Sequence, residues 1–331
     1  MPRRETGERG AADLRISVIG CGRWGSFLTW YLSRVGHSVA LYGREGSQRF
    51  ARLRAERTNG LVTLEDSIAL TADLSKAVRA AEILVISVGA QSFRGLMRQL
   101  CREDLTGKTA VLCMKGLEAG TGKRLTEIFG EYAPETPVAI WVGPGHVQDF
   151  LRGIPNCMVI DSKSREVKKY LVDAFSSSLI RFYYGQDLLG NEIGAASKNV
   201  IGIAAGMLDG LGKTALKGAL MSRGTREIAR LIRTMGGSEI SAYGLAHLGD
   251  YEATVFSPYS HNRKFGESFV RGEPYGELAE GVATTTALLK LGDDYHVELP
   301  ISRAVDSVVN SRKDPERVLS DLFLRSIKME F

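Results

Sequence analysis

The sequence contains few features that would indicate a metal site, a secreted fold or a membrane span. Its four cysteines form no CxxC pair and no His/Cys spacing typical of metal ligands. We therefore expect reduced thiols in the cytoplasm and no bound metal. No apolar run reaches roughly 18 residues, so the sequence predicts no insertion into a membrane.

Blocks of one charge sign are also missing. The formal net charge is +5 and the pI is about 9.0, but basic and acidic residues are mixed along the chain. No motif for binding nucleic acid is present, so no such partner is predicted. The basic excess is explained either by a solvated surface or by a site for anionic ligands.

The first residues, "MPRRETGERGAAD", lack the apolar segment of a secretory signal. Acidic residues among the arginines argue against an organelle-targeting segment. We expect residues 1–13 to form a short, disordered, basic leader.

Two domains are expected in 331 residues. Short apolar runs alternate with helical stretches as far as residue 188, which predicts a Rossmann-like α/β domain over 14–188 with a mostly parallel sheet. The predicted strands are 15–20, 38–43, 83–89, 109–116, 137–143, 156–161 and 180–185.

Beyond residue 188 the strand-like runs stop. The pattern predicts an all-α domain over 189–331. Its expected helices are 191–209, 214–235, 240–248, 275–291 and 302–310, and the polar stretch 247–266 is predicted to be loop-like.

The first predicted strand runs into "GCGRWG" and then a helix. Gly20, Gly22 and Gly25 have the spacing of a dinucleotide fingerprint, in which glycines allow a tight turn, close approach of a pyrophosphate, and helix packing. The second predicted strand is followed by Arg44, which favours acceptance of NADP(H) if it meets a 2′-phosphate. The alternative is a surface arginine.

Two lysines stand next to or inside apolar segments. Lys115 follows the fourth predicted strand, at the sheet edge where ligands bind, and is either placed for an anionic ligand or a lysine that simply leaves the core. Lys198 lies within a helix rich in alanine and glycine. It is either a desolvated lysine that exchanges a proton near neutral pH or a lysine that reaches the surface.

An ordered set of segments carries a resemblance to a known family. "MKGLE", "VGPGH", "GNEIGAASKNVIGIAAGMLDGLG", "SRGTREIARL", "GLAHLGD" and "AEGVATT" occur in the order found in bacterial NAD(P)-dependent sn-glycerol-3-phosphate dehydrogenases, which the chain resembles from about residue 14 to 310. The resemblance implies reversible reduction of dihydroxyacetone phosphate, for glycerophospholipid synthesis, with NADP(H) or NAD(H) as cofactor.

The same resemblance implies roles for individual residues. Lys198 would be the general acid and base, and Asp250 would hold Lys198 in place and tune it through its own negative charge. The implied substrate contacts are Lys115, Gly143, Gly145, Asn199, Thr254, Ser260, His261 and Asn262. The implied cofactor contacts are Gly20, Gly22, Trp24, Gly25, Arg44, Lys115, Val147, His261 and Glu280.

The sequence departs from the family pattern at several positions. His261 replaces an arginine that usually contacts both cofactor and substrate phosphates, with Arg263 or Lys264 as candidate substitutes. Gly145 replaces a serine or threonine, and Arg23 replaces a small polar residue. Two alternatives therefore stay open: a ketopantoate-reductase-like enzyme for another small anionic ketone, and a nicotinamide-binding sensor without turnover. The physiological direction of the reaction and a homodimer also remain open.

Overall fold

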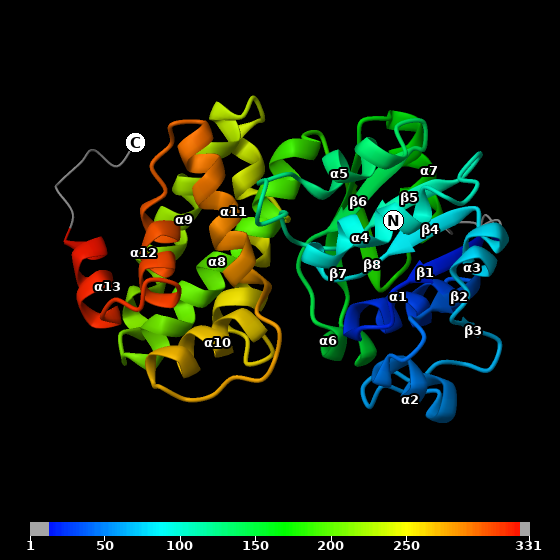
Figure 1. Cartoon of the computed structure of the whole chain (residues 1–331), viewed down its shortest axis with the longest axis horizontal. Helices are drawn as coiled ribbons and strands as arrows, with labels where there is room; N and C mark the ends of the chain where they lie inside the picture. The colour runs from blue at the N-terminus through cyan, green and yellow to red at the C-terminus, as the bar shows by residue number, and fades with distance from the viewer. Residues whose placement is uncertain (1–12, 325–331) are drawn as a thin grey trace, which may run out of the picture.

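The computed structural model describes residues 13–324, so the expected leader lies outside the described residues except for Asp13. A twisted sheet flanked by helices forms one half of the molecule, and a bundle of helices forms the other (Figure 1). We call these the sheet half and the helical half.

The sheet is mostly parallel, as predicted. Its strand order is β3-β2-β1-β4-β5-β6-β7-β8, and β6 and β7 are the one antiparallel pair of neighbours within residues 13–324. The strands are β1 (Arg15–Ile19), β2 (Ser38–Tyr42), β3 (Ala69–Thr71), β4 (Ile83–Ile86), β5 (Thr109–Leu112), β6 (Val138–Val142), β7 (Asn156–Ser162) and β8 (Ile180–Tyr184). The sequence pattern missed β3, because three residues are too short for a periodic signal.

Helices cover both faces of the sheet (Figure 1). They are α1 (Arg23–Arg34), α2 (Gln48–Glu56), α3 (Leu74–Ala80), α4 (Phe93–Leu100), α5 (Leu125–Tyr132), α6 (Val147–Leu151) and α7 (Arg165–Phe175). One core contains Phe27, Trp141 and Phe175, and another contains Phe93 and Phe129. Strands buried on both faces explain the continuous apolar runs in the sequence.

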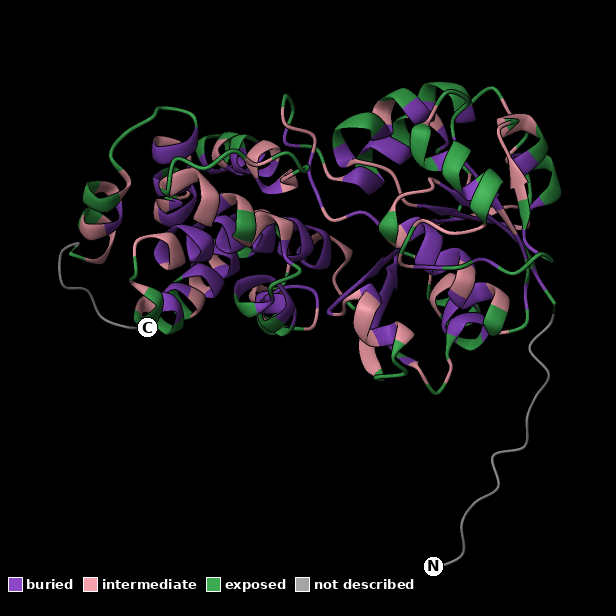
Figure 2. Ribbon diagram, turned by 90° about the horizontal axis from the view of Figure 1, so that it is seen from below, coloured by how far each residue is buried: buried purple, intermediate pink, exposed green. Residues whose placement is uncertain are grey.

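The helical half is built around α8 (Leu188–Gly210), whose residues from Gly190 to Leu208 are all buried (Figure 2). Around it lie α9 (Lys217–Thr234), α10 (His261–Val270), α11 (Glu280–Asp294), α12 (Pro300–Val309) and α13 (Pro315–Phe323). A Cβ atom at Gly206 would lie 1.9 Å from the carbonyl oxygen of Arg263, so the glycine lets α10 pack against the α8 backbone.

Two predictions for this half are wrong. Residues 240–248 form no α-helix, and short 3₁₀ turns occupy 239–243 and 248–250 instead. The stretch predicted to be loop-like contains a π-helical turn at 252–256 and the start of α10. The Ser260 hydroxyl accepts a hydrogen bond from the Arg263 amide, and this helix cap was the signal that the sequence interpretation missed.

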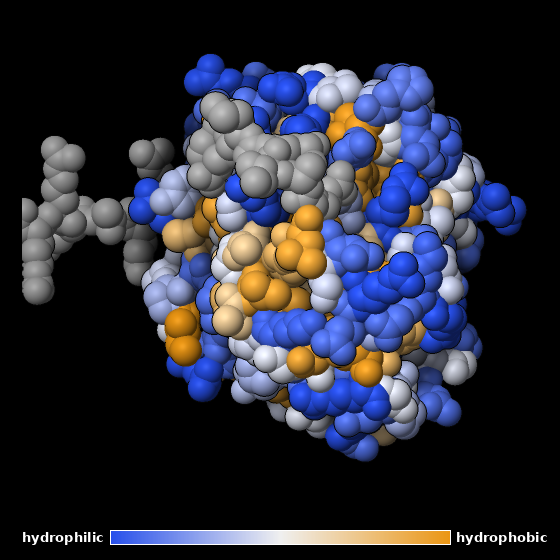
Figure 3. All heavy atoms as spheres, turned by 90° about the vertical axis from the view of Figure 1, so that its left-hand side faces the viewer, coloured by the Kyte–Doolittle hydropathy of each residue, from blue (hydrophilic) through white to orange (hydrophobic). Residues whose placement is uncertain are grey.

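Within residues 13–324, no helix combines the length and hydrophobicity that crossing a membrane requires. The outer end of the helical half carries mainly hydrophilic side chains around a small hydrophobic group (Figure 3).

Candidate active site

The glycine-rich turn between β1 and α1 has the shape that a dinucleotide requires. Gly20 has φ +118°, and a Cβ atom there would lie 2.1 Å from the Ser87 carbonyl oxygen. A Cβ atom at Gly25 would lie 1.9 Å from the Gly20 carbonyl oxygen, so helix and turn are in direct contact. Gly22 faces open space and leaves the N-terminus of α1 without a side-chain cap. These residues therefore fit the pyrophosphate of a nicotinamide dinucleotide.

The end of β2 leads to a groove of mixed charge. Arg44 is exposed there, and the neighbouring groove of about 500 Å³ is lined by Glu45, Arg54, Leu70, Thr71, Ala72, Asp73 and Lys76. The predicted contact between Arg44 and a cofactor remains a prediction.

A buried cluster joins the carboxyl edge of the sheet to the helical half. The Lys198 ammonium donates to Thr254 Oγ1 at 2.8 Å and lies 2.9 Å from Asp250 Oδ2. Lys115 Nζ donates to the same carboxylate oxygen at 2.7 Å and to the carbonyl oxygen of Gly143 at 2.6 Å. One carboxylate therefore pairs with two ammonium groups, which leaves the cluster with an excess of positive charge.

Lys198 does not reach the surface, since the residue is 8% exposed. Burial lowers its pKa to about 8, and the nearby Lys115 ammonium acts in the same direction. Asp250 opposes this shift by stabilising the charged form of the amine. The amine is therefore able to gain and lose a proton close to neutral pH.

A second layer of polar contacts supports this cluster. His247 donates from Nδ1 to the Gly194 carbonyl oxygen at 2.8 Å, and its Nε2 accepts from the Tyr251 hydroxyl at 2.7 Å. Burial lowers the pKa of His247 to about 4, so the ring is neutral at pH 7. Asn199 Nδ2 donates to the main-chain oxygen of Lys115 at 3.0 Å. These bonds fix α8 relative to the segments that carry Lys115 and Asp250.

His146 is a candidate that the predicted site residues did not include. Its Nε2 is buried without a hydrogen-bond partner, and its ring lies against that of Tyr259. Burial lowers the pKa of His146, and the Lys198 ammonium lowers it further. A neutral imidazole with an unpartnered nitrogen is able to bind a ligand hydroxyl or N–H group. The signal available in the sequence was its position in "VGPGH", directly after a strand.

The Arg23 side chain, from the sheet half, contacts His261 of the helical half. Arg23 Nη1 lies 2.7 Å from His261 Nε2, and Nη2 lies 3.3 Å from Gln148 Oε1. Since a guanidinium can only donate, Nε2 accepts and the Nδ1 proton points to the hydroxyl of Tyr275 at 2.8 Å. Burial and the Arg23 charge both lower the pKa of His261.

The candidate substitute Arg263 is directed elsewhere. Its guanidinium binds Asp209 at 2.7 Å and Glu267 at 2.9 Å, near the C-terminal end of α8. These two carboxylates hold the Arg263 guanidinium away from His261, so its candidate role as a substitute for the family arginine gains no support from the structure. Lys264, the other candidate, is exposed on α10.

The remaining predicted residues make hydrogen bonds or packing contacts within the protein. Glu280 reaches from α11 to accept from the Ala90 amide at 3.3 Å, and burial raises its pKa. Asn262 Oδ1 accepts from the Gly281 amide at 2.9 Å. At Gly145 a Cβ atom would lie 2.4 Å from the Phe150 ring, which explains why no larger residue stands there. Val147 is buried, and Trp24 packs against Phe27 and Phe150.

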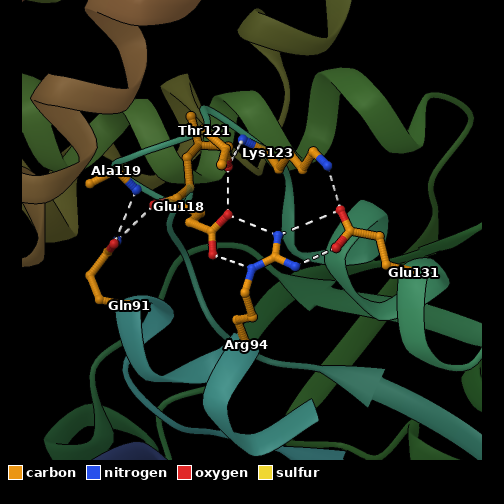
Figure 4. Close-up of polar contacts among 8 residues, drawn as sticks. Gln91, Arg94, Glu118, Ala119, Thr121, Lys123 and Glu131 are labelled. Carbon is orange, nitrogen blue, oxygen red and sulfur yellow. Dashed lines mark hydrogen bonds and ion pairs between the residues drawn. The ribbon is translucent and has the colours of Figure 1, made fainter. Parts of the chain in front are cut away.

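The loop that begins at Lys115 is held by a separate ion-pair network (Figure 4). Arg94 binds both carboxylate oxygens of Glu118, at 2.6 and 2.9 Å, and also pairs with Glu131. Gln91 donates to the Leu117 carbonyl oxygen at 2.7 Å and accepts from the Ala119 amide at 3.0 Å. These contacts position the loop, and none of the residues that make them was predicted to take part in the chemistry.

Comparison with known proteins agrees with this geometry. Residues 15–168 match the family model described as NAD-dependent glycerol-3-phosphate dehydrogenase N-terminus, and residues 187–320 match its C-terminus. A glycerol-3-phosphate dehydrogenase [NAD(P)+] of Pelodictyon phaeoclathratiforme is 36% identical, over 96% of this chain and 99% of its own. The protein of the same name from Bradyrhizobium sp. (strain ORS 278) is 38% identical, over 95% and 98% of the two chains.

Solved structures show the same relationship. The crystal structure of glycerol-3-phosphate dehydrogenase from Coxiella burnetii has a TM-score of 0.89 and 26% identity, covering 95% of this chain and 99% of that one. A 2-dehydropantoate 2-reductase from Methylococcus capsulatus is more distant, with a TM-score of 0.59 and 16% identity, and shares the fold alone. The resemblance seen in the sequence is thus confirmed: the chain belongs to the NAD-dependent glycerol-3-phosphate dehydrogenase family.

Proposed function

We propose that this chain catalyses the reversible NAD(P)H-dependent reduction of dihydroxyacetone phosphate to sn-glycerol 3-phosphate, which supplies glycerophospholipid synthesis. The observation that carries the proposal is the buried Lys198 ammonium, paired with Asp250, at the carboxyl edge of a sheet with a dinucleotide turn. The family of the chain supports the same substrate and cofactor.

The reaction adds a hydride to a carbonyl carbon and a proton to its oxygen. When bound, the reduced nicotinamide supplies the hydride. Of the three protons on Lys198 Nζ, two are directed to Thr254 and Asp250, which leaves one for the substrate oxygen. Lys198 stabilises the negative charge that develops on this oxygen and then donates the proton. In the reverse direction the neutral amine accepts the proton of the alcohol.

Neighbouring groups would orient the substrate. Lys115 uses two of its protons on Asp250 and Gly143, and the third remains for an anionic group. Asn199, Ser260 and Asn262 would order the pocket around it. For the cofactor, the turn from Gly20 to Gly25 would hold the pyrophosphate, with Trp24, Arg44, Val147 and Glu280 as further contacts.

A single assay separates the proposal from its alternatives. Loss of absorbance at the nicotinamide band is followed with NADPH or NADH, using dihydroxyacetone phosphate against a panel of keto acids that includes ketopantoate. Turnover confined to dihydroxyacetone phosphate supports the proposal. Preference for a keto acid indicates a different reductase, and binding of NADPH without turnover of any ketone indicates a sensor.

Three further points belong to the proposal. We place the boundary between the nucleotide-binding and catalytic domains at residues 188 and 189, next to the start of α8 at Leu188. Cysteines without metal or disulfide spacing support a cytoplasmic enzyme. A homodimer remains a prediction, to be tested by sedimentation.

A further inference from the structure

Arg23 carries a positive charge that no acidic side chain of the described part of the chain neutralises. It is the first residue of α1, is exposed, and its two hydrogen-bond partners, His261 and Gln148, offer uncharged acceptor atoms. Among residues 13–324, no carboxylate forms an ion pair with it. Arg263 shows the contrast, because its guanidinium is bound to two carboxylates.

The buried cluster alone provides too little positive charge for a phosphate. Lys115 and Lys198 share the Asp250 carboxylate, so these three groups carry about one net positive charge when both amines are protonated. His146 does not add to it, because burial lowers its pKa. A phosphate monoester carries roughly −1.5 to −2 charges at pH 7. A cation outside the cluster would therefore strengthen the binding of a phosphate.

We infer that Arg23 supplies this cation and binds a phosphate group between the two halves, with His261 and Gln148 as the acceptors that position its guanidinium. Of its five N–H bonds, two are directed to these acceptors and three remain for a phosphate. Arg23 belongs to the glycine-rich turn, whereas His261 begins α10. The inference rests on the proposed function in one respect: the phosphate is that of the substrate or that of the dinucleotide.

Binding measurements test this inference without the assay of turnover. The dissociation constant of NADPH is measured by quenching of tryptophan fluorescence, and that of sn-glycerol 3-phosphate by calorimetry, with glycerol as the ligand that lacks phosphate. Arg23→Ser should weaken at least one phosphate ligand tenfold or more. Arg34→Ser removes the same charge from the other end of α1 and should leave both constants unchanged.

A second experiment moves the guanidinium from the sheet half to position 261 of the helical half. Because Arg23 and His261 are in direct contact, arginine at position 261 can place its guanidinium in the same space. Adding His261→Arg to Arg23→Ser should therefore restore most of the lost affinity. When the double variant restores the affinity, loss for sn-glycerol 3-phosphate alone assigns the substrate phosphate, loss for NADPH alone assigns the cofactor, and loss for both assigns a bridge. Each of these restored losses supports the inference.

Two results would overturn it. One is unchanged affinity for both ligands in Arg23→Ser. The other is a loss that His261→Arg does not restore although the melting temperature stays that of the parent, which would make Arg23 a purely structural link. Arg23→Gln, which keeps one N–H donor group and removes the charge, replaces Arg23→Ser if that variant does not fold. Failure of the proposed function is distinguishable, because these affinities are measured whether or not dihydroxyacetone phosphate is reduced.

Discussion

At the scale of single residues, the central feature is one carboxylate that serves two lysines. Asp250 raises the pKa of Lys198, whereas burial and Lys115 lower it. The resulting pKa of Lys198 is about 8. A lysine exposed to water would stay protonated far above neutral pH. The cluster therefore sets Lys198 near the pH at which a group that must both donate and accept a proton is most effective.

The first prediction concerns pH. Reduction needs the Lys198 ammonium, so its kcat should fall as pH rises through about 8. Oxidation needs the neutral amine, so its kcat should rise through the same range. Initial rates in both directions between pH 6 and 10 check this.

Removal of the amine tests the same residue by mutation. Lys198→Met should bind NADPH normally and lose turnover by roughly 10² or more. Near-native turnover in that variant would remove Lys198 from the mechanism.

The second prediction concerns Asp250. Asp250→Asn removes the charge that raises the Lys198 pKa and leaves Lys115 beside it without a counter-charge. The midpoint for reduction should move to lower pH, and the reduction rate at pH 8 should fall by about tenfold or more. The pH profile of the variant is compared with that of the parent protein. A midpoint that stays in place would show that Asp250 only positions the lysine.

The third prediction concerns the choice of cofactor. Arg44 is exposed at the end of β2, where a carboxylate would repel a 2′-phosphate. Arg44→Asp should weaken NADPH by roughly 1–3 kcal/mol, the range for a charge-assisted hydrogen bond, and change NADH much less. Fluorescence titration with both cofactors measures this. Equal affinity for NADPH before and after the change would leave Arg44 as a surface residue.

At the scale of elements, the glycines of α8 decide how closely its neighbours approach. Gly206→Ala would place a Cβ atom 1.9 Å from the Arg263 carbonyl oxygen, and Gly218 on α9 has open space at the same position. The first change should destabilise the protein by roughly 1–3 kcal/mol through overpacking. The second should stabilise it by roughly 0.5–1 kcal/mol, because alanine favours helices. The denaturant midpoints of the two variants are compared with that of the parent protein. Equal midpoints in the two variants would contradict the close packing of α10 against α8.

Elements with clear apolar patterns could be predicted from the sequence. Strand β4 is a continuous apolar run and helix α8 is apolar along most of its length, because both are buried on all sides. The segment from Glu239 to Phe256 was not predictable in this way, because 3₁₀ and π-helical turns have no hydrophobic period of their own. Tertiary contacts hold such turns, as the bond between His247 and Gly194 illustrates.

The same limit applies to the candidate site. Lys198 could be found because an ammonium in an apolar helix violates the pattern. Arg23 and His261 are 238 positions apart and each resembles a surface residue, so their contact is visible only in the fold. Their pairing also changes the expectation for His261. The resemblance places His261 where the family has an arginine that contacts phosphates. In the structure the ring accepts a bond from Arg23, and its pKa is lowered.

At the scale of the whole molecule, each half contributes residues to the hydrophobic core of the other half. Leu117, from the sheet half, belongs to the core around α8. Ala195 and Ala246, from the helical half, belong to the core that contains Phe93. Separation of the halves would expose all three residues, so the halves are expected to lose stability together.

The last prediction follows from these shared hydrophobic cores. The three tryptophans, Trp24, Trp30 and Trp141, all lie in the sheet half, whereas the far-ultraviolet circular dichroism arises from helices in both halves. If unfolding is cooperative, denaturation curves from tryptophan fluorescence and from circular dichroism should coincide. Saturating NADPH should shift both curves equally, since a ligand that binds the native state stabilises everything that unfolds with it. A dichroism change that persists after the fluorescence change is complete would show that the helical half folds as an independent unit from residue 189 onward.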